Sequence, residues 1–178
     1  KTPRKMGLIL PVKGILPSLG EENWVAPNAT IVGDVRTGNH CTIWFNAVVR
    51  GDVNSISIGN YTNIQDGAVV HCTFEKTVTT IGDYVSIAHN AIVHGCTIED
   101  NVLIGMGAVV MDNAYIESGS IVAAGAVVTR GTRVPAGTIY AGNPAKYLKE
   151  VSPDAAEVFK RTAYNYVEYA SWFSNPSL

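Results

Sequence analysis

Three of the four histidines in this chain, His71, His89 and His94, lie at or near points where a six-residue repeat loses its register. The repeat shifts after Asp52, after Thr73 and just after His94. Insertions in a regular solenoid form loops, and loops on a rigid scaffold often carry function. Imidazole is a common ligand for zinc and other divalent metals, so these positions predict a metal site.

The repeat itself is marked by Val or Ile at every sixth position, and a small residue usually follows four positions later. The longest uninterrupted run of the large residue is Ile98, Ile104, Val110, Ile116, Val122, Val128 and Val134. Alternating large and small residues suit the interior of a narrow coil. The pattern predicts an all-β solenoid, and it resembles the left-handed parallel β-helix of hexapeptide-repeat proteins. That resemblance implies three hexads in each triangular coil.

Three hexads per coil place Val49, Val70 and Val93 on the same face of successive coils. The residues that follow them, Arg50, His71 and His94, then form an outward-facing column. Neighbouring members of the column are expected to lie about 4.8 Å apart, the spacing of strands in a sheet. Two stacked imidazoles at that spacing are able to share one metal ion.

His89 falls on the preceding face of the coil, where His71 and His94 of the same chain are hard to reach. A second copy of the chain, packed around a threefold axis, would bring its own His89 to the pair. We therefore predict a homotrimer with a metal site at each subunit interface. Gln65 shares the His89 face one coil away and is expected to line the same cleft. Three histidines plus a water molecule are typical of an open, catalytic zinc site.

The flanking segments complete a single-domain organisation. Residues 1–24 are predicted to be an irregular N-terminal segment, residues 25–145 the β-helix, and residues 146–178 a C-terminal α-helix packed on it. Ser152 and Pro153 are typical of an N-cap and a first helical residue. Apolar spacing from Asp154 to about Trp172 then indicates the helix itself.

Composition narrows the class of partner and the compartment. A formal charge of −2 and a pI of about 6.1 indicate no nucleic-acid partner. No apolar run approaches the roughly 18 residues of a membrane span, so no membrane association is expected. Cys41, Cys72 and Cys96 are odd in number and lack CxxC spacing, which favours a reducing, cytoplasmic location.

The motifs around these histidines resemble those of the gamma-class carbonic anhydrase family over about residues 7–150. The matching segments are Val49-Arg50-Gly51-Asp52, Asn63-Ile64-Gln65-Asp66, Val70-His71, Ala88-His89-Asn90, Val93-His94-Gly95 and Tyr140-Ala141-Gly142-Asn143-Pro144-Ala145-Lys146. The resemblance implies that His71, His89 and His94 bind Zn²⁺ or Fe²⁺, and that metal-bound hydroxide converts carbon dioxide into bicarbonate.

The same resemblance assigns roles to four further residues. Arg50 and Asp52 look like the family's interface salt bridge, which positions the trimer and holds bicarbonate. Gln65 looks like the residue that orients the bound hydroxide. Tyr140 is similar to an active-site tyrosine, although it also fits as the last inward-facing residue of the β-helix.

Two departures from the best-known form of the family affect proton transfer. Val53 stands where that form has a glutamate, and the loop after His71 carries Glu75 as its single acid. Two other functions therefore stay open: acyl-CoA transfer or thioester hydrolysis, as in other hexapeptide-repeat proteins, and a metal-binding trimer with little catalysis. Cys72 is a candidate nucleophile for thioester chemistry, but it should point away from His71 because neighbouring strand residues alternate in direction.

Overall fold

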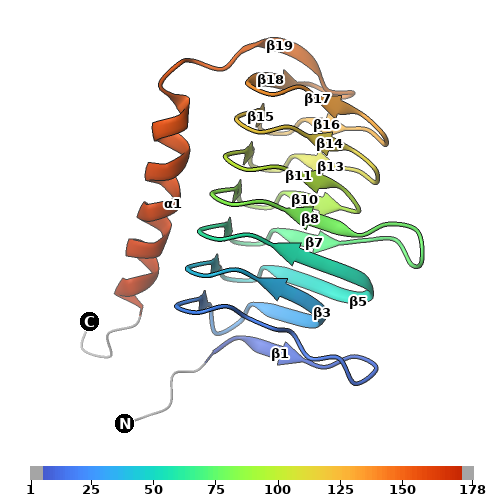
Figure 1. Cartoon of the computed structure of the whole chain (residues 1–178), viewed down its shortest axis with the longest axis vertical. Helices are drawn as coiled ribbons and strands as arrows, with labels where there is room; N and C mark the ends of the chain where they lie inside the picture. The colour runs from blue at the N-terminus through green and yellow to red at the C-terminus, as the bar shows by residue number, and fades with distance from the viewer. Residues whose placement is uncertain (1–5, 174–178) are drawn as a thin grey trace.

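The computed structural model describes residues 6–173 and shows a left-handed parallel β-helix with a single α-helix along its side (Figure 1). The predicted fold class is confirmed. The strands are β1 Leu8–Leu10, β2 Trp24–Val25, β3 Thr30–Thr37, β4 Thr42–Ile43, β5 Val48–Ile58, β6 Asn63–Ile64, β7 Val69–His71, β8 Thr79–Ile81, β9 Ser86–Ile87, β10 Ile92–His94, β11 Thr97–Ile98, β12 Leu103–Ile104, β13 Val109–Val110, β14 Tyr115–Ile116, β15 Ile121–Val122, β16 Val127–Val128, β17 Arg133–Val134, β18 Thr138–Ala141 and β19 Lys146–Glu150.

The strands form three faces of a prism. The first face contains β1, β7, β10, β13 and β16, and the second contains β8, β11, β14 and β17. The long strands β3 and β5 run through the corner between these two faces and join them into one 11-stranded sheet. The third face is an 8-stranded sheet that includes β4, β6, β9 and β12.

The register between coils follows the repeat. Val49 pairs with Val70, and Val70 pairs with Val93, so the predicted alignment of these three residues is confirmed. The pairing continues to His71 and His94, which are direct neighbours on β7 and β10. A slip of one residue would turn the buried side chains outward, and this cost fixes the register.

The interior of the prism is filled by the large and small residues of the hexads. Ile31, Ile64 and Ile87 are fully buried, as are the small residues Ala68 and Ala91. Burying one such isoleucine contributes roughly 1.5–3 kcal/mol relative to leaving it in water. The core therefore holds the coils in register and makes the faces rigid supports for the side chains outside.

The N-terminal segment is more regular than we expected. Residues Leu8–Leu10 form β1, which pairs in parallel with Thr30–Val32 of β3 and extends the first face by one strand. An open solenoid edge presents unpaired N–H and C=O groups, and β1 supplies partners for those of β3. The segment predicted as irregular over residues 1–24 thus contains one short regular strand, and its residues 1–5 lie outside the described part of the chain.

The C-terminal segment differs from the expected helix in two ways. Lys146–Glu150 form β19, which pairs antiparallel with β18 and covers the edge of the last coil. The helix α1 spans Ala155–Trp172, with Asp154 as its N-cap residue instead of Ser152. The Ser152 hydroxyl donates a hydrogen bond to Asp154 Oδ1 (2.7 Å), so its capping capacity is used locally.

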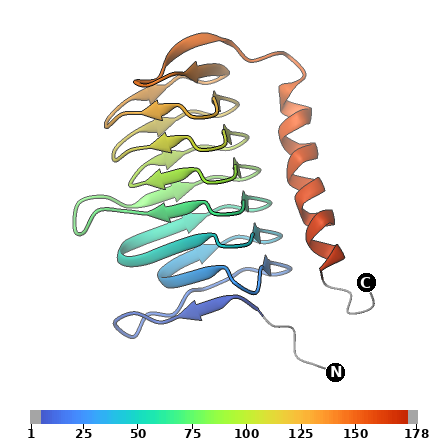
Figure 2. The same ribbon diagram turned by 180° about the vertical axis from the view of Figure 1, so that it is seen from behind.

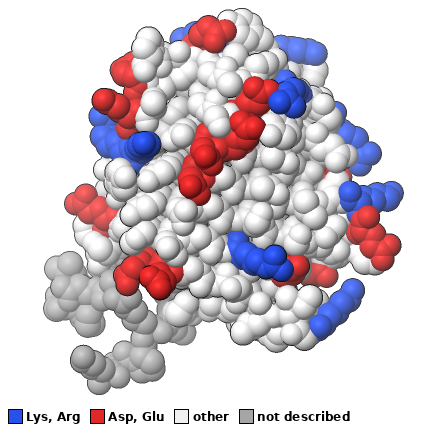
Figure 3. Space-filling view, in the orientation of Figure 1, with Lys and Arg blue, Asp and Glu red and all other residues white. Residues whose placement is uncertain are grey.

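Helix α1 lies along the third face, and the loop between β7 and β8 projects from the corner opposite it (Figure 2). Phe159 and Ala163 of α1 are buried, and the ring of Tyr166 packs edge-on against Trp44, with centroids 5.3 Å apart. In residues 6–173 no helix is long and apolar enough to cross a membrane. On the side seen in Figure 3, acidic and basic side chains both occur within a mostly uncharged surface.

Candidate metal site

The site is built on the corner between the first and second faces, where β7 and β10 end side by side. His71 Nδ1 lies 3.2 Å from His94 Nε2, and the two rings meet edge to face with centroids 5.2 Å apart. Two nitrogens bound to one tetrahedral zinc at about 2.05 Å would lie roughly 3.3 Å apart. The separation of these two donors therefore fits joint coordination of one ion.

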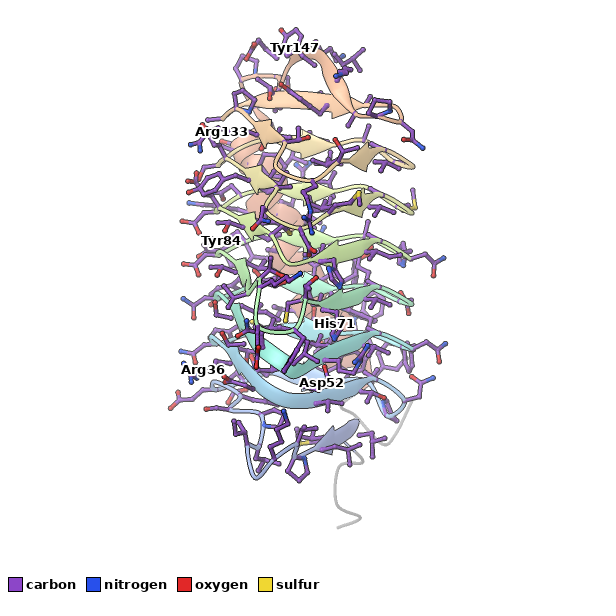
Figure 4. All side chains as sticks on the ribbon, turned by 90° about the vertical axis from the view of Figure 1, so that its right-hand side faces the viewer. Arg36, Asp52, His71, Tyr84, Arg133 and Tyr147 are labelled. Carbon is purple, nitrogen blue, oxygen red and sulfur yellow. The ribbon has the colours of Figure 1, made fainter. Side chains whose placement is uncertain are left out.

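Asp52 and Arg50 adjoin this pair from the coil below, and Figure 4 shows Asp52 and His71 together at the corner. Asp52 Oδ1 lies 3.0 Å from His71 Nε2, and Asp52 Oδ2 accepts a 2.6 Å hydrogen bond from Arg50 Nη1 of the same chain. Burial alone would raise the pKa of Asp52, but the bonds from His71 and Arg50 lower it below its ordinary value. Asp52 is thus an anion held against the histidine pair.

A second carboxylate, Asp112, approaches the pair from the coil above. Its Oδ1 lies 2.7 Å from His94 Nδ1, and its Oδ2 accepts a 2.7 Å hydrogen bond from the Thr73 hydroxyl. Burial opposes ionisation, but the bonds from Thr73 and His94 hold the pKa of Asp112 below its ordinary value. Sequence reasoning missed Asp112, because the register changes between His94 and β13 and no motif marks the residue.

His89 lies at the other corner of the first face, between β9 and β10. Its Nδ1 is 2.9 Å from Asp66 Oδ2, and both side chains are more than two-fifths exposed. At about 3.3 Å per residue, the three residues of β10 alone span roughly 10 Å, and His89 lies beyond the start of this strand while His94 lies at its end. Asp66 was not predicted as a partner of His89, although it ends the segment Asn63-Ile64-Gln65-Asp66 that resembles the family.

A single chain thus provides two converging imidazoles and a distant third. Among residues 6–173, no group of three His, Cys, Asp or Glu side chains is placed to hold a metal ion. The donor set of His71 and His94 fits a metal, but one chain leaves the coordination incomplete.

Gln65 belongs to a row of buried polar side chains on the third face, beneath α1. Gln65 is 4% exposed, and its Nε2 donates a 2.9 Å hydrogen bond to Asn63 Oδ1. Asn63 Nδ2 in turn donates to Ser86 Oγ at 2.9 Å. These bonds fix the Gln65 amide within one chain, and they place Gln65 on the side of the coil that leads to His89.

Tyr140 lies in the last coil, far along the stack from β7. It pairs with Val122 of β15, packs partly buried against the hydrophobic core, and contacts the ring of Tyr147 edge-on with centroids 6.4 Å apart. Of the two positions that the sequence left open, this geometry corresponds to the inward-facing one.

The cysteines face the interior. Cys72 and Cys96 are 1% and 2% exposed, so Cys72 points away from the half-buried His71, as strand alternation predicts. Burial raises the pKa of Cys72, and the negative charge of Asp52 raises it further. A buried, protonated thiol is a poor nucleophile.

Comparison with known proteins defines first the class and then the family. Residues 95–130 match the family model described as "Bacterial transferase hexapeptide (six repeats)". A solved structure of a hexapeptide transferase family protein from Anaplasma phagocytophilum superposes with a TM-score of 0.87 at 41% identity, over 92% of this chain and 96% of that one. The chain is therefore a hexapeptide-repeat protein.

Two curated relatives are more specific. A protein of Methanocaldococcus jannaschii named "Probable carbonic anhydrase" is 56% identical over 81% of this chain and 90% of its own length. A protein of Geobacillus kaustophilus named "Carbonic anhydrase" is 41% identical over 93% of this chain and 91% of its own. With such identity over most of its length, the chain belongs to the gamma-class carbonic anhydrase-like family of hexapeptide-repeat proteins.

Proposed function

We propose that this protein is a metal-dependent carbonic anhydrase-like enzyme that hydrates carbon dioxide to bicarbonate reversibly at sites between the subunits of a homotrimer. The observation that carries the proposal is the 3.2 Å approach of His71 Nδ1 to His94 Nε2, two nitrogens at the separation of ligands on one ion. The names of the relatives support the reaction.

The metal in this proposal is Zn²⁺ or Fe²⁺, held by His71 and His94 of one subunit and His89 of the next. Such an ion lowers the pKa of a bound water toward neutrality and so supplies the nucleophile for carbon dioxide. Asp52 and Arg50 lie beside the histidine pair, and in this proposal the guanidinium of Arg50 holds the anionic product. The proposal also gives Gln65 the role of orienting the reacting oxygen from the His89 side.

A trimer is supported by the outer surface of the first face. The outward residues of β5, β7, β10, β13 and β16 that precede the buried ones are all apolar, and Ile92 among them is 39% exposed. These residues are Val48, Val69, Ile92, Val109 and Val127. The apolar stripe runs between His89 on one corner and His71 with His94 on the other. Packing two such faces around a threefold axis would bury the stripe and bring His89 of one copy toward the pair of the next.

Proton removal is expected to depend on the solvent. Val53 packs against the core and offers no titratable group, and Glu75 is exposed on the loop beyond Thr73. Asp52 and Asp112 do contact the histidines, but both already accept hydrogen bonds from these rings and both have pKa values below the ordinary one, so we expect an external base to accept the proton. We expect the turnover number to rise with the concentration of an imidazole buffer until another step limits the rate.

The test is stopped-flow carbon dioxide hydration by protein loaded anaerobically with Zn²⁺ or Fe²⁺, after its mass in solution has been measured. We expect a particle of about three times the 19.0 kDa chain mass, and a metal-dependent rate that His94→Ala and His89→Ala both abolish. His40→Asn is the matched control, because His40 stacks on Tyr61 and has a φ of 57°, which asparagine tolerates. A metal-loaded trimer without a rate above buffer would indicate a metal-binding assembly with little catalysis.

Acyl transfer is the second candidate, favoured by the transferase name of the similar solved structure. An apolar groove of about 370 Å³ lies between α1 and the third face. None of the described residues lining it is a histidine or a cysteine. Acetyl-CoA turnover by metal-free protein would favour this candidate over hydration.

A further inference from the structure

We infer that Asp112 is a positioning residue of this site: its carboxylate fixes the orientation and the protonated nitrogen of His94, and Thr73 anchors that carboxylate. The inference rests on the proposed metal site and adds to it a carboxylate and a hydroxyl. It follows from three features of the structure around β10 and β13.

The first feature is the direction of the His94 ring. His94 uses Nδ1 to contact Asp112 Oδ1 at 2.7 Å, and this contact turns Nε2 toward His71. A carboxylate only accepts hydrogen bonds, so Nδ1 of His94 must carry the proton. The lone pair of the neutral ring then resides on Nε2, the nitrogen that faces the second imidazole. Carboxylates in this relation to a ligating histidine fix its tautomer and increase its basicity.

The second feature is the anchoring of the carboxylate itself. Asp112 is 9% exposed, and its Oδ2 accepts a 2.7 Å hydrogen bond from Thr73 Oγ1 and lies 3.4 Å from Arg130 Nη2. The backbone on either side of it is bonded to neighbouring coils, since Met111 N donates to Val128 O and Asn113 N donates to Gly95 O. Asp112 therefore has little freedom to move away from His94.

The third feature is the space reserved for this carboxylate. A Cβ atom at Gly95 would collide with Asp112 Oδ1 and with Thr77 Oγ1. Thr77 Oγ1 accepts a 2.9 Å hydrogen bond from Thr73 N, which closes the short loop after β7. The loop that lacks a row of acids thus has another function in this chain, because its threonines secure Asp112 against His94.

The experiment combines metal affinity with a measurement of the His94 tautomer that needs no metal. In ¹⁵N-histidine-labelled, metal-free protein at about pH 8.5, where ordinary histidines are neutral, long-range ¹H–¹⁵N correlations report which ring nitrogen is protonated. His94→Gln assigns the signal. We expect the Nδ1–H tautomer in the wild type and a mixed population in Asp112→Ala. Zinc affinity, measured by chelator competition, should fall about 10–100-fold.

Two further variants keep the test decisive if Asp112→Ala folds poorly. Thr73→Val removes the hydroxyl that anchors Asp112 and should weaken zinc binding, as Asp112→Ala does. Thr73→Ser keeps a hydroxyl at this position and should bind zinc as tightly as the wild type. Asp34→Asn, a surface carboxylate paired with Arg36 at 3.4 Å, is the control and should leave zinc affinity unchanged.

Folded Asp112→Ala and Thr73→Val proteins with wild-type zinc affinity and an unchanged tautomer would overturn the inference. If the wild type binds no zinc, the proposed function fails, yet the tautomer of His94 still reports on Asp112. The two failures are therefore distinguishable.

Discussion

A site shared between subunits makes a quantitative prediction for mixtures of inactive variants. His89→Ala lacks the single histidine at the corner between β9 and β10, and His94→Ala lacks one member of the pair at the other corner. Each variant alone should assemble but bind little metal, because every interface lacks one of three ligands. A mixed trimer differs, since one interface can take the intact pair from a His89→Ala subunit and His89 from a His94→Ala subunit.

The expected recovery follows from this geometry. In a ring of three equivalent interfaces assembled at random from equal amounts, the pair is intact on half of the subunits and His89 on the other half. Both conditions hold together at about one quarter of the interfaces. Metal content and hydration rate should therefore return to roughly one quarter of the wild-type values.

The assay is coexpression of the two variants with different tags, followed by zinc analysis and stopped-flow hydration of the unfractionated mixture. Trimers purified by both tags in sequence contain no homotrimers, so their recovery should be about one third, one complete interface in three. The matched control is the mixture of His71→Ala with His94→Ala. Because the two residues lie 3.2 Å apart on one chain, no interface in that mixture has an intact pair, and no recovery is expected. Equal recovery in both mixtures, or none in proven mixed trimers of the first kind, would refute the shared site.

Three further predictions concern the fold and its titrating groups. Ile87→Ala, at a fully buried position two residues before His89, should lower the free energy of unfolding by about 2–5 kcal/mol in urea titrations, and Ile87→Val by about 0.5–1.5; equal effects would contradict close packing. Hydrogen bonds from Tyr115 and Ser118 lower the pKa of Glu99. The ionised carboxylate therefore adds to the free energy of unfolding at pH values above its ordinary pKa of about 4.3, and this stabilisation is lost as the pH falls through the lowered pKa of the folded state. Glu99→Gln should remove this part of the pH dependence of unfolding, which is worth less than about 1 kcal/mol at such an accessible position. An unchanged pH profile of the free energy of unfolding would contradict the role of Glu99. Burial raises the pKa of Cys41 to about 11 and of Cys96 to about 12, so a thiol reagent at neutral pH should label the chain only after unfolding, and rapid labelling of the native protein would show that the interior opens.

The coil and its register could be predicted because the buried positions must be apolar and recur at every sixth residue. Val49, Val70 and Val93 each begin a hexad, and their inward direction determines that the residues after them point outward. The pairing of His71 with His94 follows from that alternation alone. The position of His89 on the preceding face follows in the same way.

The flanking strands β1 and β19 and the two carboxylates Asp112 and Asp66 could not be predicted in this way. β1 and β19 form because the edges of the stack need partners, and a short apolar or charged segment carries no periodic signal of that role. Asp112 contacts His94 across a coil whose register changes after His94, so counting hexads does not align the two residues. Asp66 reaches His89 through side-chain conformation, which no spacing rule specifies.

The contacts of Asp112 and Asp66 with the histidines affect how the proposed site between subunits would form. Asp112 orients His94 and Asp66 orients His89 within one chain, so both rings are arranged before two subunits meet. Ordering these side chains is then part of folding, and association need not supply the free energy for it. The rigid coils keep the two corners of the first face at a fixed separation, and in the proposed trimer the docking of two such faces would bring the third histidine to a pair that is already in place. If the proposal holds, metal binding should stabilise the assembled form over the separated chains, because all three nitrogens would then meet only in the assembly.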